Sequence, residues 1–503
     1  MVEYLMGVDL GTGGCKVSLI DTEGNFISEG YSEYPSYHPH AGWVEQKPRD
    51  WIAAFKGALQ RAVETKNVAL SRIAGLSVDA SAHNMVLLNH DGEIIRDTIM
   101  WQDQRAAAEV VFLKTHYLPL IQNTTFATPS ATWSLPQLLW IRKHEPEAFQ
   151  RIDKIMFIDD YMRYQLTGCI STTHIQAQGS LMFDNTRMEW SEEIIRLTGL
   201  PLSAFPEVKR ATDLSGYVTR EAAELFGLKE GTPVVMGASD TALESYSVGG
   251  IHPGDCILKM ATAGGINVFR NKGEKFEDMF VYSHVVDDTW YYARGTVSAA
   301  QALRWYRDTF CREELSQEKR GGKNTYQVLD LEAEKIAPGA NGLFFHPYMS
   351  GERSPYWDSK LRASFTGFSS MHTRGHFNRA ILEGVTYSLK QCFESMEAFG
   401  KIGKISFVGG GAKSALWRSI LADVFNRPIV KYKRDDSSLG GAMLTGVALG
   451  IFRSHEDAVK KTAEIDCIVQ PAPERVALYR KYYPLYIEIH DDLVHTYRKY
   501  EDE

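Results

Sequence analysis

Short apolar runs separated by glycine turns alternate with longer amphipathic segments along this chain. The first run, Tyr4 to Val8, is β-prone, and a second strand pattern resumes at Lys16 after the turn Gly11 to Gly14. The pattern predicts a strand, a tight loop and a strand, which together form a hairpin. It excludes a Walker loop and a dinucleotide fingerprint, because each of these glycine motifs leads into a helix.

The tip of this hairpin carries groups that suit a phosphate. Backbone amides near Gly13 can face an anion because no bulky side chain covers them. The carboxylate of Asp9 stands at the base of the turn, and the hydroxyl of Thr12 and the ammonium of Lys16 stand beside it. A plain hairpin with a glycine turn explains the same residues, so the phosphate hypothesis depends on the rest of the chain.

A second strand, glycine turn and strand occurs in the middle of the chain. Cys256 to Ala261 is a strand pattern, Thr262 to Gly265 is the turn, and Ile266 to Phe269 resumes the strand. Its likeness to the opening element indicates two related domains that face one cleft. We therefore expect one domain over residues 1–248 and a second over residues 249–503.

The segments between these elements favour an alternation of strands and helices. Short apolar runs predict further strands at 25–31, 73–78, 84–89 with 93–95, 234–237, 341–349, 405–408 and 428–430. Apolar residues at helical spacing predict helices at 48–65, 106–114, 135–144, 160–167, 190–197, 240–248, 299–310, 377–399, 414–425, 438–449 and 474–500. This alternation is typical of an α/β protein.

Composition narrows the class of protein further. A chain of 503 residues is too long for one hydrophobic core. A net charge of −8 argues against nucleic acid as a partner. The six cysteines lie far apart, without the spacing of a disulfide framework or a zinc site. We find neither a leader pattern before the first strand nor an apolar run that could span a membrane. We therefore expect a cytoplasmic enzyme with no membrane partner.

Four stretches resemble, in order, the motifs of the FGGY family of carbohydrate kinases. The opening Asp-Leu-Gly-Thr-Gly-Gly is similar to the family's first phosphate loop, and Thr132 to His144 and Ala363 to Glu383 resemble its two signatures. Gly409 to Ala412, followed by Trp417, is similar to its adenosine-binding turn and helix. The resemblance implies an α/β fold of two actin-like, ribonuclease H-like ATPase domains with a central cleft. It also implies an ATP-dependent carbohydrate kinase that uses Mg²⁺.

The resemblance assigns roles to individual residues. Asp240 would be the catalytic base, although a helix cap explains its position as well, and Asp9 would hold Mg²⁺ through water. The sugar-side residues would be His83, Trp101, Asp103 and Asp240. The ATP-side residues would be Thr12, Gly13, Lys16, Thr262, Gly264, Gly410, Gly411 and Ala412.

Within the family, xylulokinases are the most similar group. Trp101 to Arg105 resembles their Trp-Asn-Asp-x-Arg, and Ser350 to Pro355 is nearly their Ser-Gly-Glu-Arg-Thr-Pro. The resemblance implies phosphorylation of D-xylulose to D-xylulose 5-phosphate. Ser81-Ala82-His83-Asn84 departs from their Gln-Met-His-Gly, so another ketose, a polyol, gluconate or a signalling carbohydrate stays open as the substrate.

One alternative belongs to another functional class. A non-catalytic, actin-like ATP-binding protein would share both glycine turns. The sugar-side residues and both FGGY signatures argue against this alternative. The expected partners are therefore a small sugar and ATP, and the sequence leaves a homodimer open.

Overall fold

The computed structural model describes residues 3–276, 278–398 and 400–499. The chain forms two compact units, and each draws on three stretches of sequence. Unit 1 comprises Met1–Ile251, Asn271–Tyr291 and Arg434–Glu464. Unit 2 comprises His252–Arg270, Tyr292–Lys433 and Ile465–Glu503. The expected domain boundary after residue 248 stays a prediction.

Unit 1 is built on a six-stranded sheet whose strand order is β13-β14-β5-β1-β2-β3. The predicted opening hairpin is confirmed, because β1 pairs antiparallel with β2 and runs parallel to β5. The parallel pairing brings the carboxyl ends of β1 and β5 to one edge of the sheet. The bounds of these strands are β1 Tyr4–Leu10, β2 Gly14–Asp21, β3 Phe26–Glu33, β5 Ile73–Ala80, β13 Leu214–Tyr217 and β14 Pro233–Val235.

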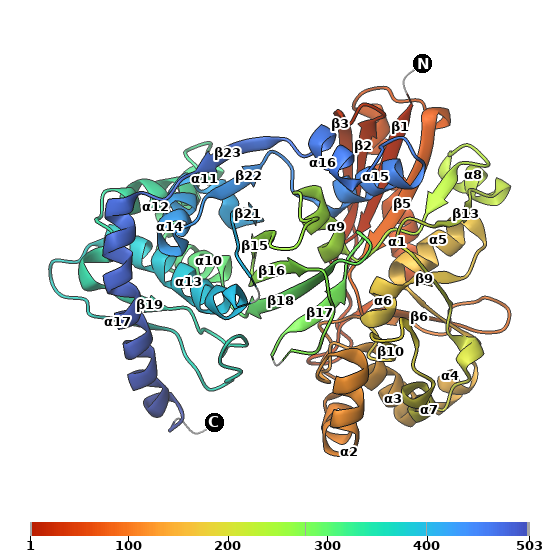
Figure 1. Cartoon of the computed structure of the whole chain (residues 1–503), viewed down its shortest axis with the longest axis horizontal. Coiled ribbons are helices and arrows are strands. Elements are labelled where there is room, and N and C mark those ends of the chain that lie inside the picture. Colours follow the sequence, from red (N-terminus) through yellow and green to blue (C-terminus); the bar gives the residue numbers. More distant parts are fainter. Residues whose placement is uncertain (1–2, 277, 399, 500–503) are drawn as a thin grey trace. The chain divides into compact units, whose positions relative to one another are not determined.

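Helix α15 (Ser437–Ala448) lies against β1, although the two are more than 400 residues apart in sequence. Figure 1 shows this helix in blue beside the red strands β1 and β2. Gly7 permits the close approach, since a Cβ at this position would lie 1.8 Å from the carbonyl oxygen of Ser438. Helix α1 (Pro48–Glu64) covers the opposite face, where Trp51 packs in one core cluster with Val8.

Unit 1 also contains further short strands and helices. The predicted strand near Met85 is confirmed. Its predicted hairpin with 93–95 forms as a short antiparallel bridge between Leu88 and Ile94, closed by the hydrogen bond from the amide of Ile95 to the carbonyl oxygen of Leu87. β6 also pairs with β8, which was not predicted. The elements are β4 Glu45–Gln46, β6 Met85–Leu88, β7 Thr98–Ile99, β8 Lys154–Phe157, β9 Ser171–Thr173, β10 Phe183–Asp184, β11 Glu189–Trp190, β12 Glu207–Lys209, β17 Phe280–Ser283, α2 Ala107–Thr125, α3 Ser134–His144, α4 Pro146–Gln150, α5 Ile158–Thr167, α6 His174–Gln178, α7 Glu192–Thr198, α8 Arg220–Phe226, α9 Asp240–Ser247 and α16 His455–Thr462.

Unit 2 contains the second predicted strand, glycine turn and strand. β15 (Cys256–Met260) pairs antiparallel with β16 (Gly264–Arg270) and runs parallel to β21 (Ile405–Val408). The strand order continues as β16-β15-β21-β22-β23, with β22 at Ile429–Tyr432 and β23 at Ile465–Val469. The central strands of this sheet therefore repeat the antiparallel and parallel pairings of β2, β1 and β5.

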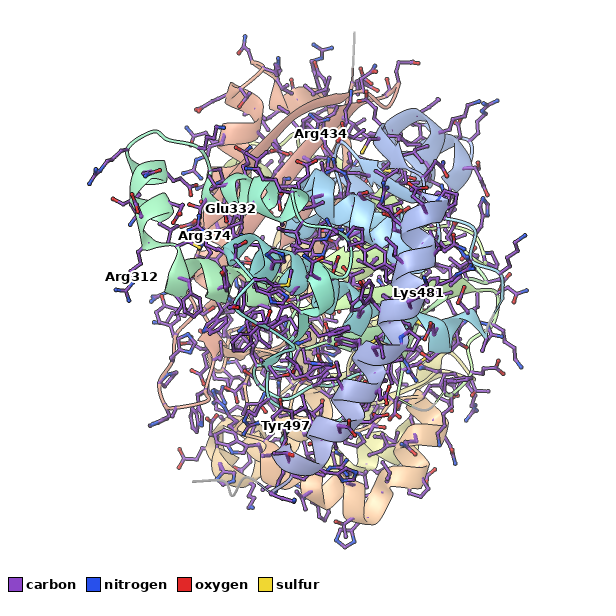
Figure 2. All side chains as sticks on the ribbon, turned by 90° about the vertical axis from the view of Figure 1, so that its left-hand side faces the viewer. Arg312, Glu332, Arg374, Arg434, Lys481 and Tyr497 are labelled. Carbon is purple, nitrogen blue, oxygen red and sulfur yellow. The ribbon has the colours of Figure 1, made fainter. Side chains whose placement is uncertain are left out.

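Helices complete unit 2. Arg374, at the start of α13, pairs with Glu332 of α12, and Figure 2 shows these two side chains next to each other. The same view shows α17 from Lys481 to Tyr497. The remaining bounds are β18 Trp290–Thr296, β19 Phe344–His346, β20 Ser364–Thr366, α10 Ala300–Phe310, α11 Arg312–Lys319, α12 Thr325–Glu334, α13 Arg374–Glu397, α14 Ala415–Phe425 and α17 Pro473–Tyr497. Residues 399 and 500, where we predicted that α13 and α17 end, lie outside the described residues.

Candidate active site

Two aspartates, the half-buried Asp9 and the buried Asp79, meet at the carboxyl ends of the central strands of unit 1. Asp9 on β1 stands in register with Asp79 on β5. One oxygen of Asp9 and both oxygens of Asp79 are buried without a hydrogen-bond partner among the described residues. Burial and the charge of Asp240 raise the pKa of Asp9 to about 7. Burial and the charge of Asp9 raise the pKa of Asp79 well above its usual range.

Asp240 and Asp436 belong to the same acidic group. Asp240 is the first residue of α9, and its carboxylate accepts hydrogen bonds from the amide and hydroxyl of Thr241, at 2.5 and 3.1 Å. Asp436 caps α15 by accepting a hydrogen bond from the amide of Leu439. The negative charges of Asp240 and Asp436 both favour a protonated Asp9. A cation at this edge of the sheet would relieve their repulsion.

This group does not form a closed metal cage. Among the described ranges, no set of three or more His, Cys, Asp and Glu side chains is arranged to hold a metal ion. Mg²⁺ is usually held by one or two carboxylates, with water and substrate phosphates as its other ligands. The unpartnered oxygens of Asp9 and Asp79 fit this requirement.

Lys16, a predicted phosphate contact, forms ion pairs in this structure. Its ammonium lies 3.1 Å from Asp436 and 3.0 Å from Glu29. These pairs place the ammonium beside the acidic group, and its contact with a phosphate stays a prediction. The β1–β2 turn itself is open at Gly13, where a Cβ would meet no atom within 4 Å. The carbonyl oxygen of Thr12 accepts a hydrogen bond from Gln46, which braces the turn.

His83 is held in one orientation by its surroundings. Its Nδ1 lies 2.7 Å from the carbonyl oxygen of Gly179, and its ring packs on Trp133 in a T-shaped arrangement at a centroid distance of 4.7 Å. Burial lowers the pKa of His83 to about 4, so the ring is neutral at physiological pH. A carbonyl oxygen only accepts hydrogen bonds, so Nδ1 must carry the proton and Nε2 must be an acceptor.

Asn84, which departs from the xylulokinase pattern, faces its own loop. Its amide nitrogen donates to the carbonyl oxygens of Ser81 and Ala82, at 2.9 and 3.0 Å. Its carbonyl oxygen accepts a hydrogen bond from the amide of Trp101 at 2.6 Å. This residue therefore fixes the loop that carries His83 to the turn that carries Trp101.

Asp103 is buried in an ion-pair network. Its carboxylate accepts hydrogen bonds from the guanidinium of Arg105, at 2.8 and 2.9 Å, and from the amide of Val44. Arg105 also pairs with Glu45 and stacks over Trp43 at 3.7 Å. These contacts give Asp103 a structural task, and its hydrogen bond to a sugar stays a prediction.

The second glycine turn lies in unit 2, and some of its main-chain groups already form hydrogen bonds within the protein. The amide of Gly264 donates to the hydroxyl of Thr296 at 3.2 Å, and a Cβ at Gly264 would lie 2.8 Å from that hydroxyl. The carbonyl oxygen of Thr262 accepts hydrogen bonds from Ala299 and Gln301, at the start of α10. The amide of Gly264 is already bonded to Thr296. The turn therefore requires glycine at this position because a side chain would not fit.

A cavity of about 730 Å³ lies within unit 2 beside this turn. Its volume falls within the range of small-molecule sites. Gly410 and Gly411 line it, whereas Ala412 is buried beside them. The other lining residues are Ala261, Thr262, Ala300, Leu303, Arg304, Asn324, Tyr326, Gln327, Asp330, Lys413, Ser414 and Trp417.

Comparison with known proteins decides the family. The N-terminal domain of the FGGY family of carbohydrate kinases matches residues 4–245, and the C-terminal domain of that family matches residues 267–449. The chain belongs to the FGGY family of carbohydrate kinases. The predicted family and its fold class, an α/β protein with two actin-like domains, are confirmed. The predicted activity, ATP-dependent phosphoryl transfer to a carbohydrate, is confirmed at the level of the family.

Individual relatives of this FGGY kinase are similar over nearly the whole chain. A xylulose kinase of Bacillus subtilis is 31% identical over 496 residues, which cover 97% of each protein. The crystal structure of xylulose kinase from Rhodospirillum rubrum is 25% identical, with a TM-score of 0.90 over 99% of this chain and 100% of that chain. The gluconate kinase structure from Lactobacillus acidophilus is 26% identical, with a TM-score of 0.90 over 100% of both chains.

The sequence pattern of this FGGY kinase did not reveal several residues near the candidate site. Asp79 was one of them, although an acidic residue at the end of a buried strand was a usable signal. Trp133 packs near Phe280 and Tyr282, at centroid distances of 6.0 and 6.3 Å. The charge of Asp240 contributes to a raised pKa of Tyr282, which burial raises most. No local sequence pattern could have predicted that these aromatic residues pack together, because about 150 residues of sequence separate Trp133 from the other two.

The described residues contain no helix that is both long enough and apolar enough to cross a membrane.

Proposed function

We propose that this FGGY kinase transfers the γ-phosphoryl group of ATP to the terminal hydroxyl of D-xylulose. The acidic group at the strand ends of unit 1 carries this proposal, because phosphoryl transfer needs a base and a cation in one place. Similarity to xylulose kinases over nearly the whole chain supports the sugar. The Ser350 to Pro355 loop supports the same group of kinases.

Asp240 is the proposed catalytic base. It stands at the first turn of α9 and influences the charge state of both Asp9 and Asp79. As a carboxylate, it would accept the proton of the attacking sugar hydroxyl. Bound Mg²⁺ would neutralise the charge of the transferred phosphoryl group. Asp9 would hold this ion, and Asp79 would stand next to it.

His83 and Trp101 are the proposed sugar contacts. The Nε2 atom of His83 can accept a hydrogen bond from a sugar hydroxyl, because its Nδ1 donates to Gly179. The indole of Trp101 can cover an apolar face of the sugar. Asp103 would act mainly through its contacts with Arg105 and Val44.

ATP contacts are proposed in both units. In unit 2, the cavity lined by Gly410 and Gly411 would accept the adenosine, with Ala412 behind them. The turn at Thr262 and Gly264 would contact phosphates. In unit 1, Thr12, Gly13 and Lys16 would contact the β- and γ-phosphates.

Gluconate is the second candidate substrate. The gluconate kinase from Lactobacillus acidophilus supports it, because that structure has the same TM-score as the xylulose kinase structure. The Nε2 atom of His83 can accept a hydrogen bond from a hydroxyl of either compound, so this contact alone does not separate gluconate from D-xylulose. Measured kcat/KM values for D-xylulose and gluconate test this choice: a higher value for gluconate would replace D-xylulose in the proposal. A cytoplasmic location and a homodimer stay predictions.

A further inference from the structure

Arg163 on α5 is fully buried in unit 1. Its guanidinium lies 2.9 Å from Asp159 and 2.5 Å from Asp160. Asp160 also accepts a hydrogen bond from the amide of Phe157 at 3.0 Å, which fixes this carboxylate at the start of the helix. Two carboxylates therefore hold the guanidinium in one orientation.

The same guanidinium donates to two main-chain carbonyl groups of the central sheet. It lies 3.3 Å from the oxygen of Val78 and 2.5 Å from the oxygen of Met236. Val78 immediately precedes Asp79 on β5. Met236 follows the last residue of β14 and lies four positions before Asp240. Arg163 thus joins the two segments that lead into both aspartates.

The ladder between β5 and β14 is interrupted at this point. Val235 pairs with Ser77, and the next contact is the bridge between Ala80 and Ser239. Gly237 lies in the gap with a φ of +78°, and a Cβ there would lie 2.4 Å from the carbonyl oxygen of Val78. The guanidinium supplies hydrogen bonds where the sheet supplies none.

We propose that Arg163 is a positioning residue, which fixes the Asp240 segment against the Asp79 segment by bridging the carbonyl groups of Val78 and Met236. The proposal rests on the proposed role of Asp240 as the base. A carboxylate that is displaced by about 1 Å can lose about 10²-fold in rate while ligand binding persists. Arg163 itself touches neither substrate, so its effect should fall on turnover.

The test compares Arg163→Lys with Arg163→Met in the full chain. Lysine keeps the positive charge between Asp159 and Asp160, but it has one nitrogen in place of Nη1, which reaches both carbonyl groups, and Nη2, which reaches Asp160. We expect Arg163→Lys to lower kcat by about 10²-fold, with KM values for sugar and ATP within about threefold of the parent. Arg163→Met should lose more activity and more stability, because it leaves two buried carboxylates without the cation that pairs with them.

Two controls separate positioning from general destabilisation. Ile194→Ala removes a buried side chain from a separate core cluster of unit 1, so it should lower the urea midpoint and leave kcat unchanged. Arg142→Lys changes an arginine that donates to the carbonyl oxygens of Leu197 and Thr198 at a different place, and it should also keep kcat. The proposal is overturned if Arg163→Lys keeps the parental kcat, or loses activity only in proportion to its unfolded fraction.

Gly237→Ala provides a second route if both Arg163 variants fail to fold. The added Cβ would push the segment of Gly237 away from the carbonyl oxygen of Val78 without removing a charge. This variant should lower kcat more than it raises either KM. An unchanged kcat in a folded Gly237→Ala protein would also overturn the proposal. Asp240→Asn serves as the reference: if it stays active, the proposed base is wrong, whereas an inactive Asp240→Asn with a normal Arg163→Lys refutes only the positioning role.

Discussion

Asp9 and Asp79 stand in register on neighbouring parallel strands, and three of their four carboxylate oxygens are buried without a hydrogen-bond partner among the described residues. Two such carboxylates repel each other and favour a bound cation. We therefore expect Asp9→Asn to weaken Mn²⁺ binding in the presence of ADP by at least about 10-fold. Titration calorimetry measures this affinity without requiring turnover.

Asp21→Asn is the control for the Mn²⁺ measurement, because Asp21 lies at the opposite end of the β1–β2 hairpin. This variant should bind Mn²⁺ as the parent does. Equal affinity of Asp9→Asn and the parent would remove Asp9 from the metal site.

Asp240→Asn should separate binding from chemistry. An amide cannot accept the proton of the sugar hydroxyl, so turnover should fall by about 10²-fold or more, while sugar and nucleotide still bind. Steady-state kinetics and equilibrium binding measure the two effects. Asp287→Asn, which alters an exposed partner of Arg210, should leave both unchanged. Near-normal turnover of Asp240→Asn would show that another group is the base.

His83 should affect stability at acidic pH. Its folded pKa is lowered to about 4 by burial, whereas an unfolded histidine titrates near about 6.5. As the pH falls through this interval, the unfolded chain binds a proton that the folded ring does not, so the free energy of unfolding decreases. His83→Gln should weaken this dependence by the share that His83 contributes, which urea unfolding at several pH values measures. A matched His116→Gln change at an exposed position should keep it, and equal pH profiles for His83→Gln and the parent would contradict the assignment.

The cavity in unit 2 offers a matched pair of glycines. A Cβ added at Gly410 or at Gly403 would meet no atom within 4 Å, so alanine fits at both positions without a clash. Of these two glycines, Gly410 lines the cavity and Gly403 does not. Gly410→Ala should therefore raise KM for ATP and leave KM for the sugar unchanged, while Gly403→Ala should change neither. A normal KM for ATP in Gly410→Ala would place adenosine elsewhere.

The sequence predicted those parts of the fold that depend on local patterns. Both strand, turn and strand elements form where alternation and glycine placed them. The helix predicted over 438–449 is confirmed, but its packing on β1 was not predicted. Small residues such as Gly7 and Gly441 permit a close approach without identifying the partner. The pairing of β6 with β8 was not predicted for the same physical reason: β8 lies far along the chain, and only the nearby turn gave a local signal.

In the candidate site, too, local motifs predicted individual residues but not their tertiary contacts. Motif resemblance identified Asp9, His83 and Asp240 as candidates without any knowledge of their neighbours. It could not show that Lys16 is paired with Asp436, since the two are 420 residues apart and meet only in the folded unit. Asn84 looked like a change in sugar recognition, but its hydrogen bonds face the loop and the amide of Trp101. Contacts of this kind depend on tertiary packing.

The most direct test of the proposed function is kcat/KM for D-xylulose, measured against L-ketoses, pentitols and gluconate with ATP and Mg²⁺. A site that bonds particular hydroxyls can discriminate by orders of magnitude, so D-xylulose should exceed every other substrate by about 10²-fold or more. If any of these compounds has a higher kcat/KM than D-xylulose, the D-xylulose proposal is wrong and only the carbohydrate kinase assignment stands.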